Sequence, residues 1–368
     1  MIQDIEEQFT DTVDIVDRLA TLGARYDAAP NFPVESMAAL IRSGHHRRFA
    51  PQGCGGQAFD SEAARNRAMA KNLRQVGRGD LSIGRLYEGH VNAMLLFDWY
   101  GTSEQHRWLT HALDSGAWFG VWATEKAPGV RLTQVGNASL SGEKIFASGA
   151  GGLDYALVTA ASTDHARRLV IVSASDKARA DLSGWRVRGM RASASGRYSL
   201  EGVAVEPLML LGEPGDYDLD PRFTAGAWRF CATQLGGIEA LVLEIQRSMC
   251  DGARANPVQR ARFADAVVAM RTAGLWVAKS AESFAADHEN AVTMARLTRR
   301  VVENAGFTVM EAAARILGTQ SAFDGQRTDK IIRDLSLYLR QGGPDHAHDE
   351  AAKTLLDHDI WSGGERLW

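Results

Sequence analysis

The sequence predicts an α+β fold in which helical regions at both ends flank a central β-domain. Apolar residues recur at helical spacing up to about residue 115, form short β-prone runs from there to about residue 211, and return to helical spacing beyond about residue 220. Because 368 residues exceed one typical core, several subdomains are expected. We place an N-terminal helical domain at 1–115, a middle β-domain at 116–215 and a C-terminal four-helix bundle at 216–368.

The N-terminal region is predicted to begin with a helix over residues 3–28. One stripe of it is apolar, with residues three or four apart: Ile5, Phe9, Val13, Val16 and Leu19. Two further helices are expected within 61–99, joined near 77–80. A hydroxyl of Thr102 or Ser103 is expected to cap the next helix.

Short apolar runs over 155–159 and 169–172 predict strands of the middle domain. Long helices are predicted over 226–250, 258–286 and 291–317, where apolar residues return to helical spacing. These helices are expected to pack as an antiparallel bundle, with part of their apolar surface against another subunit.

Composition narrows the function classes. The chain is 45% hydrophobic and 23% charged, as in soluble globular proteins. A net charge of -4 without a Lys/Arg run disfavours nucleic-acid binding. Three widely spaced cysteines fit neither a disulfide framework nor a metal cluster, and no signal core or long apolar window is present. We therefore expect a cytoplasmic protein without a membrane span and without a metal site.

One stretch, residues 119–149, has the pattern of a ligand-binding wall. Two β-prone segments each end on a hydroxyl residue, Thr124 or Ser148, beside a large aromatic, Trp122 or Phe146. Hydroxyls can bond ring heteroatoms and aromatics can cover a ring face, so the stretch could hold a flat aromatic ligand. An ordinary hairpin with core aromatics would give the same pattern.

Histidines are the other candidates for chemistry. His90 lies on a predicted helix and can exchange a proton near neutral pH, although a histidine hydrogen-bonded at a subdomain boundary would look the same. The adjacent His45 and His46 lack further ligands at metal-binding spacing, so a solvated helix end is expected there.

Four motifs in this order resemble the acyl-CoA dehydrogenase superfamily of flavoproteins over nearly the whole chain. They are Trp-Ala-Thr-Glu at 122–125, Gly-Glu-Lys-Ile-Phe-Ala-Ser at 142–148, Gly-Met-Arg at 189–191 followed by Leu-Glu-Gly-Val-Ala-Val-Glu-Pro at 200–207, and Lys-Ile-Ile-Arg-Asp at 330–334. The resemblance implies an acyl-CoA dehydrogenase-like fold, FAD as cofactor, and a homodimer or homotetramer in which a neighbouring subunit completes the FAD site.

The resemblance also implies roles for the wall residues. Ala123 and Thr124, next to Trp122, match the positions that bond the pyrimidine side of the flavin ring. Phe146 and Ser148 match the aromatic and hydroxyl that cover and bond the isoalloxazine.

Other residues match contacts to the phosphates and the adenosine. Arg254 resembles the arginine that reaches the pyrophosphate, and a guanidinium can fork onto phosphate oxygens. Arg315, Gly318 and Thr319 fall where the partner subunit supplies contacts to the adenosine diphosphate portion. The family usually has a glutamine and a glycine pair there, so Arg315 and Thr319 depart from its pattern.

The main departure concerns catalysis. The glutamate that removes the α-proton in the dehydrogenases aligns with Gly342, and the alternative position near Ala227 has no carboxylate either. The serine of the loop that contacts CoA is replaced near Val130. The flavin-side motifs are thus present and both substrate-side motifs are absent.

Three functions follow from this combination. The first is an FAD-dependent dehydrogenase that oxidises a CH–CH bond of an acyl-CoA or related substrate and passes electrons to a partner, with Asp345, His346 or Glu350 as base. The second is a flavin monooxygenase that takes reduced flavin from a reductase and uses oxygen, with Ser148, His90 and a C-terminal histidine at the site. The third is an inactive homologue. The first is our main expectation.

Overall fold

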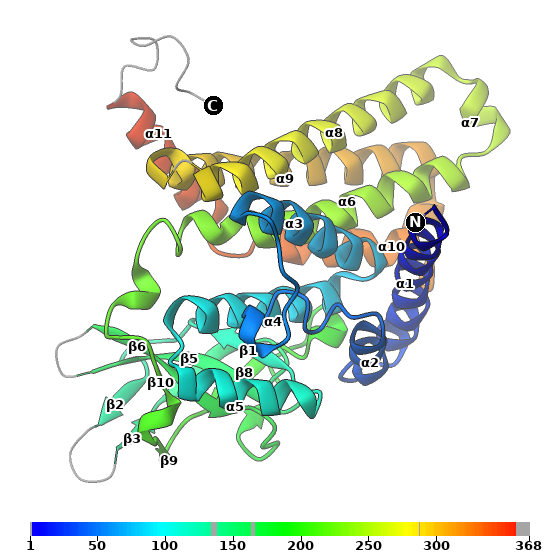
Figure 1. Cartoon of the computed structure of the whole chain (residues 1–368). Coiled ribbons are helices and arrows are strands. Elements are labelled where there is room, and N and C mark those ends of the chain that lie inside the picture. Colours follow the sequence, from blue (N-terminus) through cyan, green and yellow to red (C-terminus); the bar gives the residue numbers. More distant parts are fainter. Residues whose placement is uncertain (1, 134–137, 163–165, 287, 358–368) are drawn as a thin grey trace.

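The computed structural model describes residues 2–133, 138–162, 166–286 and 288–357, without the side chains of 2–14, 288 and 289. Helices at both ends flank a central β-region (Figure 1), which confirms the expected α+β class. The predicted stripe positions Ile5, Phe9 and Val13 have side chains outside the described residues, whereas Val16 and Leu19 are buried.

The N-terminal helices agree with the periodicity of the sequence. Their bounds are α1 Ile2–Ala28, α2 Val34–Arg42, α3 Glu62–Gly79, α4 Leu81–Tyr100 and α5 Ser103–Asp114. Thr102 caps α5 in a capping box, in which Gln105 N donates to the Thr102 hydroxyl (3.2 Å) and Thr102 N to the Gln105 side chain (2.9 Å). Helix α4 packs against α3, α6 and β1, so it lies between the β-region and the C-terminal helices.

The β-region contains two sheets. Their strands are β1 Phe119–Trp122, β2 Arg131–Thr133, β3 Ser139–Ser141, β4 Glu143–Ala147, β5 Tyr155–Ala161, β6 Arg167–Ser173, β7 Ala180–Asp181, β8 Gly196–Ser199, β9 Val203–Ala204 and β10 Leu210–Leu211. The larger sheet has the order β10-β6-β5-β2-β3-β9, with β1 parallel to β5; the smaller has the order β4-β8-β7. Strands β5 and β6 are antiparallel from Tyr155 opposite Ser173 to Ala161 opposite Arg167. The predicted runs at 155–159 and 169–172 therefore pair with each other.

The three predicted C-terminal helices are present within a few residues of their expected ends. The C-terminal elements are α6 Trp228–Ser248, α7 Asp251–Ala255, α8 Pro257–Ala286, α9 His288–Leu317, α10 Arg327–Tyr338 and α11 Pro344–Leu356. Helices α6, α8, α9 and α10 pack together (Figure 1), and α3 lies against α6. A Cβ at Gly236 would lie 2.1 Å from the Arg74 carbonyl oxygen, so this approach of α3 to α6 needs a glycine.

Within the described part of the chain, no helix is long and apolar enough to cross a membrane. The same residues hold no group of three or more His, Cys, Asp or Glu side chains arranged to hold a metal ion.

Candidate functional site

Two adjoining cavities lie where the β-region meets the helices. The larger has a volume of about 540 Å³ and the smaller of about 470 Å³. Four residues line both cavities: Arg85, Thr124, Gln341 and Gly342. They come from α4, from the segment after β1 and from the loop after α10, so distant parts of the sequence build a single composite site.

The stretch singled out in the sequence forms one wall of the smaller cavity. Its two segments lie side by side, since Ile145 N donates to the Thr124 carbonyl (3.0 Å) and Trp122 Nε1 to the Ser148 carbonyl (3.0 Å). Thr124, Phe146 and Ser148 line this cavity. Trp122 is buried behind them, and Ala123 lines the larger cavity instead. Trp122 therefore positions Ser148 rather than facing a ligand in the cavity.

A row of three serine hydroxyls runs along the same wall. Ser193 Oγ donates to the Met190 carbonyl (2.8 Å), so its single proton is used there. Ser195 must then donate to Ser193, and Ser148 must donate to Ser195, over 2.9 Å in each case. The Ser148 oxygen is left with acceptor lone pairs for a ligand. The sequence motifs did not indicate this row.

Backbone strain also gathers at the smaller cavity. Among the described residues, three non-glycine residues have positive φ: Phe146 (52°), Met190 (55°) and Ala194 (45°). Phe146 and Met190 line the cavity, and Ala194 lies between two of its serines. Such residues cost about 1–3 kcal/mol each and cluster at functional sites, where the surrounding structure holds them. The strained residues therefore lie at the same wall as the serine row.

One face of α4 lines the larger cavity. Its lining residues follow helical spacing: Arg85, Glu88, Asn92, Leu96 and Trp99. Glu88 accepts from Arg85 in an ion pair and from the Asn92 amide. Arg229 Nε of α6 donates to Asn92 Oδ1 (2.6 Å). Three- and four-residue spacing of polar residues was the sequence signal that could have revealed this face.

His90 lies outside both cavities. Its Nε2 donates to the His46 carbonyl (2.8 Å), and its Nδ1 accepts from Phe119 N (3.2 Å). Burial lowers the pKa of His90 well below its usual value, and the nearby His46 lowers it further. Both ring nitrogens are thus engaged by the backbone. This geometry gives His90 the structural role that was the alternative to catalysis.

The solvated helix end expected at His45 and His46 is wrong, because both side chains are buried. His46 Nε2 lies 2.8 Å from the Ala117 carbonyl, and its ring stacks on His90 with centroids 4.6 Å apart. A backbone carbonyl and a ring face make burial of this imidazole tolerable, and burial lowers its pKa. Neither contact is visible in the local sequence.

The first turn of α11, which follows the loop after α10, brings one of the remaining candidate bases to the site. Gly342 lines both cavities, and Arg299 of α9 donates to its carbonyl (2.8 Å). His346 lines the larger cavity. The Asp345 side chain is 97% exposed, and it lies 3.7 Å from Arg300. The structure thus places His346, but not Asp345, at the cavity.

The residues predicted to contact flavin phosphates and adenosine lie elsewhere. Arg254, at the end of α7, donates to the Met249 carbonyl (2.7 Å), and Arg315, near the end of α9, pairs with Glu311 (2.7 Å). Gly318 and Thr319 follow directly after α9. The end of α9 lies beside the start of α8, which follows α7 (Figure 1), since Gln259 Nε2 donates to the Arg315 carbonyl (3.3 Å). None of the four residues lines either cavity. Their contact with a flavin stays a prediction that requires a neighbouring subunit.

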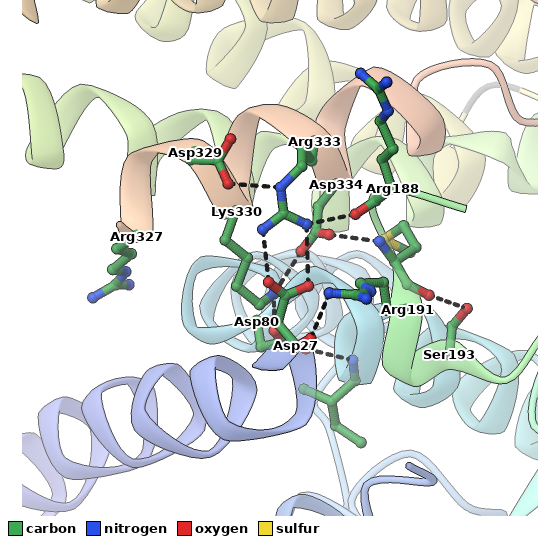
Figure 2. A network of polar contacts seen from close by, with 12 residues as sticks. Asp27, Asp80, Arg188, Arg191, Ser193, Arg327, Asp329, Lys330, Arg333 and Asp334 are labelled. Carbon is green, nitrogen blue, oxygen red and sulfur yellow. Dashed lines mark hydrogen bonds and ion pairs between the residues drawn. The ribbon is translucent and has the colours of Figure 1, made fainter. Parts of the chain in front are cut away.

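A network of ion pairs fixes the wall of the smaller cavity against α10 (Figure 2). Lys330 Nζ lies 2.5 Å from Asp80 Oδ2 and 2.6 Å from Asp334 Oδ2. Asp334 Oδ1 accepts from Met190 N (2.5 Å) at the strained turn. Arg333 pairs with Asp27 of α1 (2.6 Å). The motif at 330–334 thus joins α1, the start of α4 and the cavity wall.

The charges of this network stabilise one another. Burial lowers the pKa of Lys330, but the carboxylates of Asp334 and Asp80 raise it more, and the net pKa lies above the usual value. Burial raises the pKa of Asp334, and the positive charge of Lys330 offsets part of this rise. The ammonium is therefore the charge that keeps two buried carboxylates compatible with folding.

Comparison with known proteins gives relatives in sequence and in structure. No protein-family model matches the chain. The dibenzothiophene monooxygenase of Rhodococcus erythropolis is 29% identical over 160 residues, which cover 40% of this chain and 38% of that protein. The chain thus matches less than two fifths of the length of this curated relative.

Solved structures match over nearly the whole chain. The dibenzothiophene monooxygenase TdsC from Paenibacillus sp. A11-2, in complex with FMN and indole, gives a TM-score of 0.83 at 18% identity, over 96% of this chain and 97% of that one. Butyryl-CoA dehydrogenase from Megasphaera elsdenii gives a TM-score of 0.80 at 17% identity, over 95% and 97%. At these identities the likeness shows the fold.

The main expectation, an FAD-dependent acyl-CoA dehydrogenase with a base from elsewhere, is wrong. The relatives in sequence are monooxygenases, and the structure with bound flavin described above contains FMN rather than FAD. The flavin-side motifs that suggested a dehydrogenase do not separate the two activities, because both occur on this fold. The helix–sheet–helix architecture of this chain is the fold that TdsC and butyryl-CoA dehydrogenase share.

Proposed function

We propose that this chain is a flavin-dependent monooxygenase that receives reduced FMN from a separate reductase and uses oxygen to oxygenate a small molecule. The match to dibenzothiophene monooxygenases supports this proposal. The smaller cavity is the proposed flavin site, and the larger, adjoining cavity is the proposed substrate site.

The observation that carries the proposal is the lack of a free carboxylate in the described walls of the two cavities. Among the described residues that line the two cavities, Glu88 is the sole carboxylate, and Arg85 and Asn92 both engage it. The glutamate that removes the α-proton in the dehydrogenases must lie within hydrogen-bond reach of that proton. Oxygenation needs no such carboxylate, so the composition of the cavities favours a monooxygenase.

The smaller cavity has the chemistry to hold a flavin ring. Phe146 and Trp185 offer aromatic faces, and Thr124 and Ser148 offer hydroxyls beside them. When bound, reduced flavin supplies the electrons that activate oxygen. Of the candidates named from the sequence, Thr124, Phe146 and Ser148 keep their proposed contacts to this ring. Ala123 reaches the larger cavity instead, and Trp122 supports the wall.

The serine row suits reduced flavin in particular. Reduction adds N–H donors to the flavin ring, and the row leaves the Ser148 oxygen as an acceptor. His346, at the wall of the larger cavity, is the residue we propose to exchange a proton with the substrate. We also propose that Arg254 of a neighbouring subunit contacts the FMN phosphate.

Anaerobic binding of reduced and oxidised FMN tests the proposal. We expect the wild type to bind reduced FMN more tightly, and Ser195→Ala to lower this preference about two- to tenfold, because Ser148 then donates elsewhere or turns toward the ring. Ser175→Ala changes an exposed serine and serves as the control. Equal affinity for both redox states in the wild type, or full reduction of bound flavin by an acyl-CoA without oxygen, would count against the proposal.

A further inference from the structure

The larger cavity carries an excess of positive charge. Five arginines line it: Arg85, Arg222, Arg229, Arg296 and Arg299. Among its described lining residues, the sole carboxylate is Glu88, which forms its ion pair with Arg85. Four guanidinium groups therefore face the cavity without a carboxylate of its wall to neutralise them.

Arg229 and Arg299 are the two most buried of these arginines. Arg229 has the fewer hydrogen-bond partners. It is 7% exposed, and its one described hydrogen bond runs from Nε to Asn92 Oδ1 (2.6 Å). Its Nη1 is buried and has no hydrogen-bond partner among the described residues. Burial lowers the pKa of Arg229 to about 10, against the opposing effect of Glu88, so the group stays charged at neutral pH. A buried guanidinium nitrogen without a hydrogen-bond partner is costly, and an acceptor on a ligand would offset that cost.

Aromatic rings hold the Arg229 guanidinium in place. Its Cζ lies 5.9 Å from the ring centroid of Trp99, 5.8 Å from that of Trp228 and 5.7 Å from that of Phe284. Arg222 also lies over Trp99, with its Cζ 5.1 Å from the ring centroid. Ring faces favour the cation but accept no strong hydrogen bond. The guanidinium is therefore positioned, partly dehydrated and in need of an acceptor.

We propose that the substrate is a small organic oxyanion, a carboxylate, sulfinate or sulfonate on an aromatic or apolar body, whose head group binds Arg229. A guanidinium presents a planar fork of donors that matches such head groups. Leu96, Trp99 and Val121 supply apolar wall for the body. This inference rests on the proposed function, because that function makes the larger cavity the substrate site.

Calorimetric binding to the protein with oxidised FMN tests the inference without turnover. The probes are indole-3-carboxylate and its neutral counterpart of similar shape, indole-3-carboxamide. We expect the wild type to bind the carboxylate about tenfold more tightly or better, as a charge-assisted bond of this kind provides. Arg229→Gln is expected to remove the preference and leave affinities for the carboxamide and FMN unchanged, whereas Arg229→Lys keeps part of the preference.

Arg107→Gln makes the same change at an exposed arginine and is expected to behave as the wild type. Equal wild-type affinity for both probes overturns the inference, and this comparison does not depend on whether Arg229→Gln folds. The inference is also overturned if Arg229→Gln loses affinity for FMN but keeps the preference for the carboxylate, because Arg229 then contacts the flavin.

Turnover separates the two proposals. If the carboxylate preference and its loss in Arg229→Gln are found but reduced FMN and oxygen yield no oxygenated product from any probe, the anion site stands and the monooxygenase is refuted. If neutral indole is oxygenated and no anion preference is found, the monooxygenase stands and the anion site is refuted.

Discussion

Replacing Lys330 by methionine tests the network that fixes the cavity wall. Lys330 is 12% exposed and lies between Asp80 and Asp334, whose side chains are 5% and 1% exposed. The substitution keeps most of the side-chain volume but removes the cation, so two buried carboxylates face each other without compensation. Breaking a buried pair in this way costs about 3–5 kcal/mol.

This loss of unfolding free energy corresponds to a decrease in melting temperature. Unfolding entropy near 60 °C is about 2.1 cal/mol/K per residue, so for a 368-residue chain that unfolds cooperatively the loss corresponds to about 4–6 °C. Differential scanning calorimetry at pH 7 measures it. Lys353→Met is the matched control, since Lys353 also contacts two carboxylates, Asp349 and Glu350, but is 61% exposed. The control is expected to have the same melting temperature as the wild type.

The pH dependence gives a second check. Without the ammonium, the pKa of a carboxylate of the Asp80 and Asp334 pair rises in the folded state above its unfolded value. A raised folded-state pKa contributes stability as pH falls, so the difference in melting temperature between wild type and Lys330→Met should shrink from pH 7 to pH 5. A melting temperature of Lys330→Met equal to that of the wild type at pH 7, or a difference that grows on acidification, would refute the reasoning.

Further variants test the proposed contacts. Arg254→Ala should weaken FMN retention by about 1.5–3 kcal/mol through loss of a charged phosphate contact, without a change in melting temperature; unchanged FMN affinity by equilibrium dialysis removes Arg254 from the site. His346→Asn should lower the rate of oxygenation without a change in melting temperature, because the proposed proton-exchanging group is lost; a steady-state rate equal to that of the wild type contradicts this role. His90→Asn should lower the melting temperature and leave the rate at a permissive temperature unchanged, which calorimetry and kinetics distinguish.

Local patterns in the sequence explain much of the fold. The helices α6, α8 and α9 follow from apolar periodicity, and the cap at Thr102 follows from its chemistry. Thr124, Phe146 and Ser148 could be singled out for the cavity wall because each of two segments has a hydroxyl residue two positions after a large aromatic. These features depend on short-range spacing, which a single sequence contains.

The site itself depends on long-range packing. His90 and Asn92 lie two residues apart on α4, which is buried on most sides, so polarity alone did not tell which face meets a cavity. Arg229 gains its significance from aromatic rings of three helices and from the lack of a carboxylate partner in the cavity wall. The choice of a dehydrogenase was wrong because the flavin-side motifs belong to the fold rather than to one reaction.

The most direct test of the proposed activity is isotope incorporation. The protein is supplied with reduced FMN by a flavin reductase under ¹⁸O₂, with indole and indole-3-carboxylate as probes, and the products are analysed by mass spectrometry. We predict a product that contains one ¹⁸O atom and does not form without either the protein or oxygen. Oxidation of a CH–CH bond of an acyl-CoA by this protein, with no ¹⁸O in any product, would contradict the account.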